Sequence, residues 1–201
     1  MKTEIGYKLF RKNVKTGKVY PLFVSRNEET PVGTWIEAKA GEMTANGKVK
    51  SSLGGLAYRG GWHLNEEAPY VEHIYSKLYN PDGAEFDENG NFDRVHKHEK
   101  GWEFVWFEIE YETTIDCQPL ADANGWKNGK FNPRLAQLEM VDKHGYYRYK
   151  TNPNMFGTWI IAGNIKLVRE LSRQEVVDKC KEYGLNALPT VEEHMAGRRW
   201  K

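Results

Sequence analysis

The residues with the clearest chemical potential are two arginines and a short aromatic segment that contains an imidazole. Arg11 and Arg59 offer cations for phosphate oxygens, while Trp62 and His63 offer a flat ring and a hydrogen-bonding partner for a ribose hydroxyl. Tyr70 adds another ring a few residues later. A dinucleotide needs such partners together, so these five residues form a candidate cofactor-binding site. The alternative is that the arginines are surface charges and the rings are core residues.

Two carboxylates form the candidate catalytic pair. Glu108 and Glu110 lie two residues apart, so in a strand they share one face, where each raises the pKa of the other. Carboxylates paired in this way serve as general acid and base. Ordinary solvent-facing carboxylates at the end of a strand are the simpler interpretation.

The sequence does not predict a metal site. Counted from Glu85, Gly90 occupies position 6 of a calcium loop, but His96 stands at position 12 where a bidentate glutamate is needed. His96 and His98, together with Glu99, lack a second pair of ligands. We therefore expect a solvated turn here and no metal.

Motifs of several large enzyme classes are absent from the sequence. It contains no Walker-type or GxGxxG phosphate loop, no HExxH and no GxSxG, which disfavours kinase, Rossmann, zincin and hydrolase functions. Cys117 and Cys180 have no CxxC or CxxH neighbour. They are expected to be reduced, buried thiols with a structural role.

Charge and hydropathy restrict the partners and the location. Lys plus Arg number 29 against 28 for Asp plus Glu, so no global field attracts nucleic acid, and nucleic acid is not favoured as a partner. Apolar runs are only a few residues long, so no membrane span is expected, and residues 1–6 lack the apolar region of a secretion signal. We expect a cytoplasmic protein, whose oligomeric state the sequence leaves open.

Aromatic-rich strands are the elements expected to hold these residues. Trp, Tyr and Phe number 7, 11 and 8 and make up 13% of the chain, whereas all hydrophobic residues make up only 39%. This composition predicts a core of few, large side chains or, alternatively, a stacking surface for flat rings. Residues 102–111 alternate between two faces that are both apolar in the first half, which predicts a strand in the middle of a sheet.

Turns and glycines divide the rest of the chain into further elements. Turn-bounded apolar segments predict strands at residues 5–11, 18–24, 56–64 and 146–149. Gly163 separates residues 158–162 from 164–171, which form either a strand pair or one bulged strand. Loop-like composition marks a mobile loop at about 40–55, a polar excursion at about 80–101 and an irregular segment at 118–140.

Helices are expected in two places. Apolar residues at helical spacing predict a helix at 66–79. Capping boxes at Ser172 and Glu175 and at Thr190 and Glu193 predict C-terminal helices at about 172–197. The chain is therefore expected to be one α+β domain, residues 1–201, with a mostly antiparallel or split aromatic-rich sheet flanked by a few helices.

Three segments together resemble the ADP-ribosyltransferase fold, in the order of residues 8–11, 60–64 and 158–171. The resemblance implies that NAD is the cofactor, that Arg11 contacts its ribose and that Trp62 or His63 lies beneath the nicotinamide. The family's catalytic glutamate would fall near Thr158, where no carboxylate is present. The whole chain is also similar to proteins of gut Bacteroidota and their phages, which implies a mobile element or a phage–host conflict.

These observations give three hypotheses for the function. The first is an ADP-ribosyltransferase-like enzyme that acts on NAD or a related nucleotide, with Glu108 or Glu110 in place of the missing glutamate. The second is a non-catalytic binding or inhibitor protein of a mobile element. The third is a protein that binds single-stranded nucleic acid, which requires a basic surface beside the stacking rings.

Overall fold

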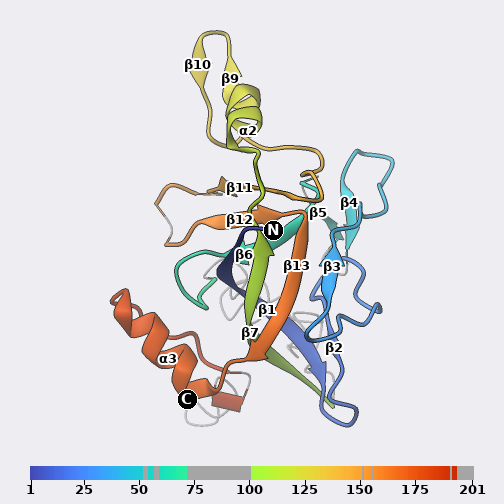
Figure 1. Cartoon of the computed structure of the whole chain (residues 1–201), viewed down its shortest axis with the longest axis vertical. Coiled ribbons are helices and arrows are strands. Elements are labelled where there is room, and N and C mark those ends of the chain that lie inside the picture. Colours follow the sequence, from blue (N-terminus) through green and yellow to red (C-terminus); the bar gives the residue numbers. More distant parts are fainter. Residues whose placement is uncertain are drawn as a thin grey trace, which may run out of the picture.

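The centre of the molecule is a strongly curved sheet (Figure 1). The computed structural model describes residues 1–51, 54–56, 59–71, 101–150, 152–154, 156–190 and 192–193. Strands follow one another across the sheet in the order β3 (Trp35–Glu37), β13 (Asn164–Glu170), β7 (Trp102–Glu112), β1 (Thr3–Asn13), β6 (Trp62–Asn65), β12 (Trp159–Ala162), β11 (Gly145–Tyr149) and β8 (Ile115–Asp116). Neighbours are antiparallel except β11 and β8. This arrangement confirms the predicted single α+β domain.

Strand β7 lies between β1 and β13, as its two-sided apolar pattern predicts. Every residue of β1 has a partner in β7, from Thr3 opposite Glu112 to Asn13 opposite Trp102. One face of β7 is buried in the main core, where the rings of Phe10 and Phe107 meet edge to face at 5.8 Å. This long antiparallel pair is therefore the framework on which the core is built.

A bend at Gly163 closes the sheet on itself. Gly163 alone joins β12 to β13, yet β7, β1 and β6 lie between these two strands in the sheet. The sheet must curl, because β12 and β13 follow each other directly in the chain but are separated by three strands in the sheet. A Cβ at Gly163 would lie 1.9 Å from the carbonyl oxygen of Asp142, so only glycine fits there. The strand-pair alternative is wrong, because β12 and β13 bond to different neighbours.

The strands predicted at 5–11 and 18–24 are present, the second shortened to residues 19–20, and form a hairpin, whereas two other predictions need correction. β1 pairs with β2 (Val19–Tyr20) through a turn that contains Gly17 at φ 71°. Residues 66–71 form bends instead of the start of a helix, and residues 72–79 and most of the polar excursion at 80–101 lie outside the described residues. The loop at 40–55 contains the small antiparallel pair β4 (Val49–Ser51) and β5 (Gly54–Leu56), and its mobility stays a prediction.

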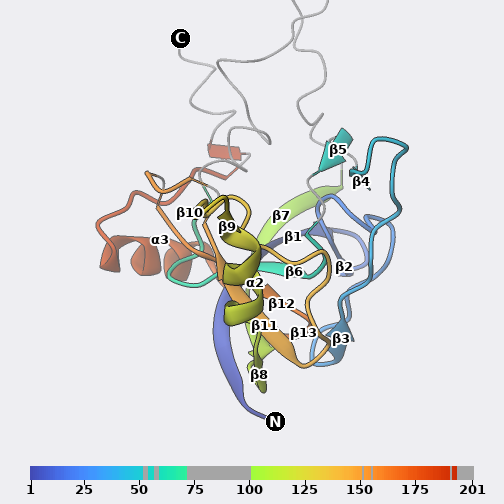
Figure 2. The same ribbon diagram turned by 90° about the horizontal axis from the view of Figure 1, so that it is seen from above.

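Helix α3 (Arg173–Glu182) confirms the first capping box. The Ser172 hydroxyl accepts a bond from the Glu175 amide, and the Glu175 carboxylate accepts one from the Ser172 amide. Val176 and Cys180 pack on Leu171 beside the outer face of the sheet. Figure 2 places α3 on the opposite side of the molecule from β3 and β4. Thr190 and Glu193 form the second pair of capping contacts, and residues 194–201 lie outside the described part.

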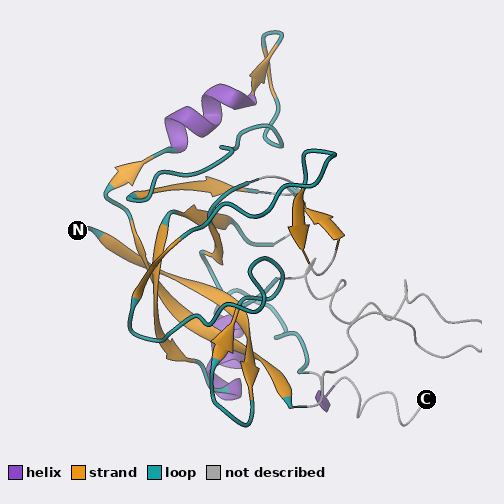
Figure 3. Ribbon diagram, turned by 90° about the vertical axis from the view of Figure 1, so that its right-hand side faces the viewer, coloured by secondary structure: helices purple, strands orange, loops and turns teal. Residues whose placement is uncertain are grey.

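The segment 118–140 is more regular than its sequence suggests. It contains helix α2 (Gln118–Gly125) and a hairpin of β9 (Trp126–Lys127) and β10 (Lys130–Phe131), which together project from one end of the sheet (Figure 3). Cys117 and Cys180 are free, buried thiols, as expected. No helix among the described residues is long and apolar enough to cross a membrane.

Replacement of Phe10 by alanine tests the importance of the β1–β7 core. Phe10 is fully buried, so Phe10→Ala should lower the free energy of unfolding by about 3–5 kcal/mol in a urea titration. Phe131→Ala is the matched control, because Phe131 is 44% exposed on the projecting hairpin, and should cost about 1 kcal/mol or less. Equal losses for the two variants would contradict the assignment of the core.

Candidate functional site

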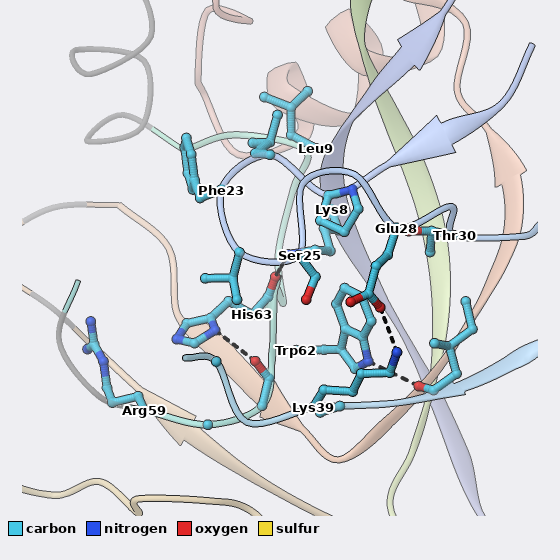
Figure 4. Close-up of a pocket in the computed structure, with 18 of the residues that line it drawn as sticks. Lys8, Leu9, Phe23, Ser25, Glu28, Thr30, Lys39, Arg59, Trp62 and His63 are labelled. Atoms are coloured by element: carbon cyan, nitrogen blue, oxygen red, sulfur yellow. Dashed lines mark hydrogen bonds and ion pairs between the residues drawn. The ribbon is translucent and has the colours of Figure 1, made fainter. Parts of the chain in front are cut away.

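A cavity of about 460 Å³ lies beside β1 and β6 and is covered by the loops at 21–30 and 36–41 (Figure 4). Its volume is in the range of small-molecule sites. β1 supplies Lys8, β6 and the residues before it supply Arg59, Trp62 and His63, and β12 supplies Trp159. Three of the five predicted cofactor-binding residues therefore share one cavity.

Lys8 brings a positive charge into this cavity without a carboxylate beside it. Its Nζ donates a 2.8 Å hydrogen bond to the carbonyl oxygen of His63 and lies 5.6 Å from the ring centroids of both Phe10 and Trp62. No carboxylate of the described residues forms an ion pair with it. Burial disfavours the charged amine and lowers the pKa of Lys8 to about 8. The site thus holds a cation that a bound anion would stabilise.

The two rings of the Gly-Gly-Trp-His segment are held by backbone carbonyls. Trp62 Nε1 donates to the carbonyl oxygen of Ile36 at 3.0 Å. His63 Nδ1 lies 3.1 Å from the carbonyl oxygen of Gly61, and because a carbonyl only accepts, Nδ1 carries the proton in this contact. The His63 ring also meets Trp159 edge to face at 5.9 Å.

Arg59 is the second cation of the cavity. Its guanidinium lies 4.3 Å from the centroid of the Tyr149 ring, and its Nε is buried without a hydrogen-bond partner. It has no ion pair within the part of the chain that the structure describes. The following residue, Gly60, is bonded to Glu139 and Val141, and a Cβ there would collide with the Glu139 carbonyl oxygen. This close backbone approach fixes the chain next to Arg59.

Among the described residues, the three acidic side chains that line the cavity are all paired with lysines. Glu28 bonds to Lys39 at 2.6 Å, which lowers the pKa of the Glu28 carboxyl. Two further ion pairs neutralise the others, between Glu29 and Lys18 at 2.6 Å and between Glu37 and Lys143 at 2.7 Å. The local balance therefore leaves Lys8 and Arg59 as an excess of positive charge.

Arg11 and Tyr70 do not line this cavity. Arg11 as a whole is 5% exposed, and its guanidinium lies 4.2 Å from the centroid of the Trp102 ring and donates to the carbonyl oxygen of Arg26 at 2.9 Å. The Tyr70 ring packs beside α3 and meets Phe156 edge to face at 5.8 Å. The structure thus divides the five predicted residues between the cavity and two neighbouring packing sites.

The carboxylates of Glu108 and Glu110 also lie outside the cavity lining. Glu110 forms an ion pair with Lys166 and accepts a 2.8 Å bond from the Thr3 hydroxyl, and these contacts lower the pKa of Glu110. Glu108 lies 3.3 Å from Arg169 on the adjacent strand. The expected mutual increase in pKa is therefore wrong for Glu110, because cross-strand cations outweigh the neighbouring carboxylate.

Sequence reasoning did not select Lys8 or Trp159 as site residues. The signal for Lys8 was present, because in a strand it shares a face with Phe10, and a lysine beside a core aromatic is unusual. Trp159 had no such signal. Among the described residues no group of three His, Cys, Asp or Glu side chains is placed to hold a metal, and the segment containing Glu85, His96 and His98 lies outside them.

Comparisons with protein-family models, with curated proteins and with solved structures gave no match to this chain. The functional argument therefore depends on the geometry of the cavity.

The pH dependence of stability tests the environment of Lys8. The pKa of Lys8 is about 8 in the folded chain and about 10.4 when unfolded, so between these values the unfolded chain binds more protons and stability rises with pH. Lys8→Met removes this contribution. The difference in free energy of unfolding between the wild type and Lys8→Met should therefore shift in favour of the wild type between about pH 8 and 10.

Lys15→Met is the control for this measurement, since Lys15 is exposed in the β1–β2 turn. Its difference from the wild type should stay constant over the same range. A constant difference for Lys8→Met would show that the amine is solvated and not confined in the cavity.

Proposed function

We propose that the cavity binds NAD or a related adenine nucleotide, and that it acts as a binding site and not as a centre of turnover. The observation that carries this proposal is the pair Lys8 and Arg59, two cavity cations without carboxylate partners among the described residues, next to Trp62 and His63. A nucleotide offers anionic oxygens and flat rings in one molecule.

The cations favour a phosphate-bearing ligand. The Arg59 guanidinium lies against the Tyr149 ring, and a planar guanidinium can bond to two phosphate oxygens at once. Lys8 provides a point charge at the sheet surface of the cavity. Because burial disfavours this charge, an anion bound at Lys8 would offset that electrostatic cost.

The aromatic side chains favour a ligand with a ring and hydroxyl groups. Trp62 is held by Ile36, so its ring does not have to be ordered when a ligand binds. His63 lines the same cavity, and an imidazole is a group that can bond to a hydroxyl. These features support recognition of a base or nicotinamide ring and a sugar within the same cavity.

The positions of the carboxylates support binding without reaction. Cleavage of NAD through an oxocarbenium-like state needs an anionic group near the departing nicotinamide. Glu108 and Glu110 are outside the cavity lining, and the acidic side chains within it form ion pairs with lysines. We therefore favour a protein that sequesters a nucleotide or inhibits a nucleotide-dependent process, which suits a phage–host conflict.

Calorimetric titration with ADP tests the proposed site. A charge-assisted contact is worth about 1.5–3 kcal/mol, so Lys8→Met and Arg59→Met should each weaken ADP binding about 10- to 100-fold. Adenosine has no phosphate, so its affinity for the two variants should be close to its affinity for the wild type. The affinity of the wild type for ADP should fall as the pH rises above about 8, while that of Lys8→Met should not.

Lys15→Met serves again as the exposed control and should bind ADP like the wild type. Equal affinities for ADP in the wild type and both cavity variants would contradict the proposal. Nicotinamide release is measured separately after incubation with NAD. Release that is lost in Glu108→Gln or Glu110→Gln would favour the ADP-ribosyltransferase-like enzyme over the binding protein.

A further inference from the structure

We propose that the projecting β9–β10 hairpin is a contact surface for single-stranded nucleic acid. It is separate from the cavity and does not depend on the function proposed there. The observations are an exposed ring at the base of a tight turn, a rigid support beneath that ring, and a local group of cations.

The shape of the hairpin is fixed by its turn. Lys127 pairs with Lys130, and the two residues between them, Asn128 and Gly129, have φ angles of 53° and 73°. Positive φ at both positions is the signature of a type I′ turn, for which Asn-Gly is the preferred sequence. The two lysines therefore leave the turn from directly opposite positions and remain close to each other.

Trp126 is presented to solvent on a firm base. It pairs with Phe131 across the hairpin, and the two ring centroids are 5.6 Å apart. The Phe131 ring in turn lies against the end of α2, where a Cβ on Gly125 would come within 2.5 Å of it. Trp126 stays 62% exposed, although Phe131 beneath it is held in place. An ordered, exposed indole is a suitable surface for stacking a base.

The charged residues of the hairpin segment are all positive. Residues 126–135 contain Lys127, Lys130 and Arg134 and no acidic residue. Within the described chain none of these three forms an ion pair with a carboxylate. The Arg134 amide bonds to the Asn132 side chain, so the backbone that carries the third cation is ordered. Although the chain has a net charge of only +1, the hairpin and the residues directly after it carry three cations and no carboxylate within residues 126–135.

Single-stranded nucleic acid matches these features better than an acidic protein segment does. Its phosphates are spaced along a flexible backbone and complement several cations, and its unpaired bases stack on aromatic faces. An acidic protein segment would be attracted by the lysines but would gain less from a single exposed indole. The cations and the ring are close in the sequence, and the folded hairpin holds them together with the Trp126 ring exposed.

Fluorescence anisotropy with a labelled oligothymidylate of about fifteen nucleotides tests this proposal on the full chain. Three phosphate contacts should give a slope of about −2 in a plot of log association constant against log salt concentration. The double variant Lys127→Gln, Lys130→Gln should reduce the slope to about −0.7. Trp126→Ala should weaken binding about 5- to 100-fold, as expected for loss of one stacked base, and should leave the slope unchanged.

The control is a double variant of two exposed lysines elsewhere, Lys15→Gln and Lys181→Gln, which should keep both the affinity and the slope. Unchanged melting temperatures would show that all variants are folded. The proposal is overturned if the oligonucleotide does not bind at low salt, or if the hairpin variants bind like the wild type. It is also overturned if polyglutamate competes as well as an oligonucleotide and Trp126→Ala has no effect, because an acidic protein would then be the partner.

Discussion

The structure depends on the close backbone approach at Gly163. At this residue the chain leaves β12 and enters β13, on the other side of three intervening strands, while its amide bonds to Gly145 and its carbonyl oxygen to Ala38. Any side chain would strike the Asp142 carbonyl oxygen. β6 pairs directly with β1, so Lys8 and Trp62 lie on neighbouring strands of this curled sheet.

The cavity is formed by backbone restraint more than by side-chain packing. Gly60 and Gly61 allow the chain to pass close to residues 139–141 and to Ile161, and backbone carbonyls then orient Trp62 and His63. Three lysine–glutamate pairs around the lining neutralise its acidic groups. This arrangement isolates two cations in a region with aromatic walls, where electrostatic interactions are stronger than in water.

The projecting unit of α2 and the β9–β10 hairpin differs from the main core in how far its aromatic side chains are buried. In the core, Phe10 and Phe107 bury their rings, and the strands supply long regular ladders. In the hairpin, Phe131 is only partly buried and contacts the Trp126 ring, and Trp126 itself is mostly exposed. The fold therefore places one of its large aromatic side chains where water surrounds it. Such a residue adds little to stability, so a binding role is the more direct account of its position.

The sequence by itself determined the elements whose signals are local. Alternation in residues 102–111, the turn before β2 and the capping box at Ser172 act over a few residues, and the structure contains the corresponding strands and helix. Tertiary structure decided what depends on distant neighbours. The ion pairs of Glu108 and Glu110 come from β13, and Arg11 turned to Trp102 instead of the cavity. Lys8 became important only when the curled sheet enclosed it, because burial and charge balance are properties of the whole fold.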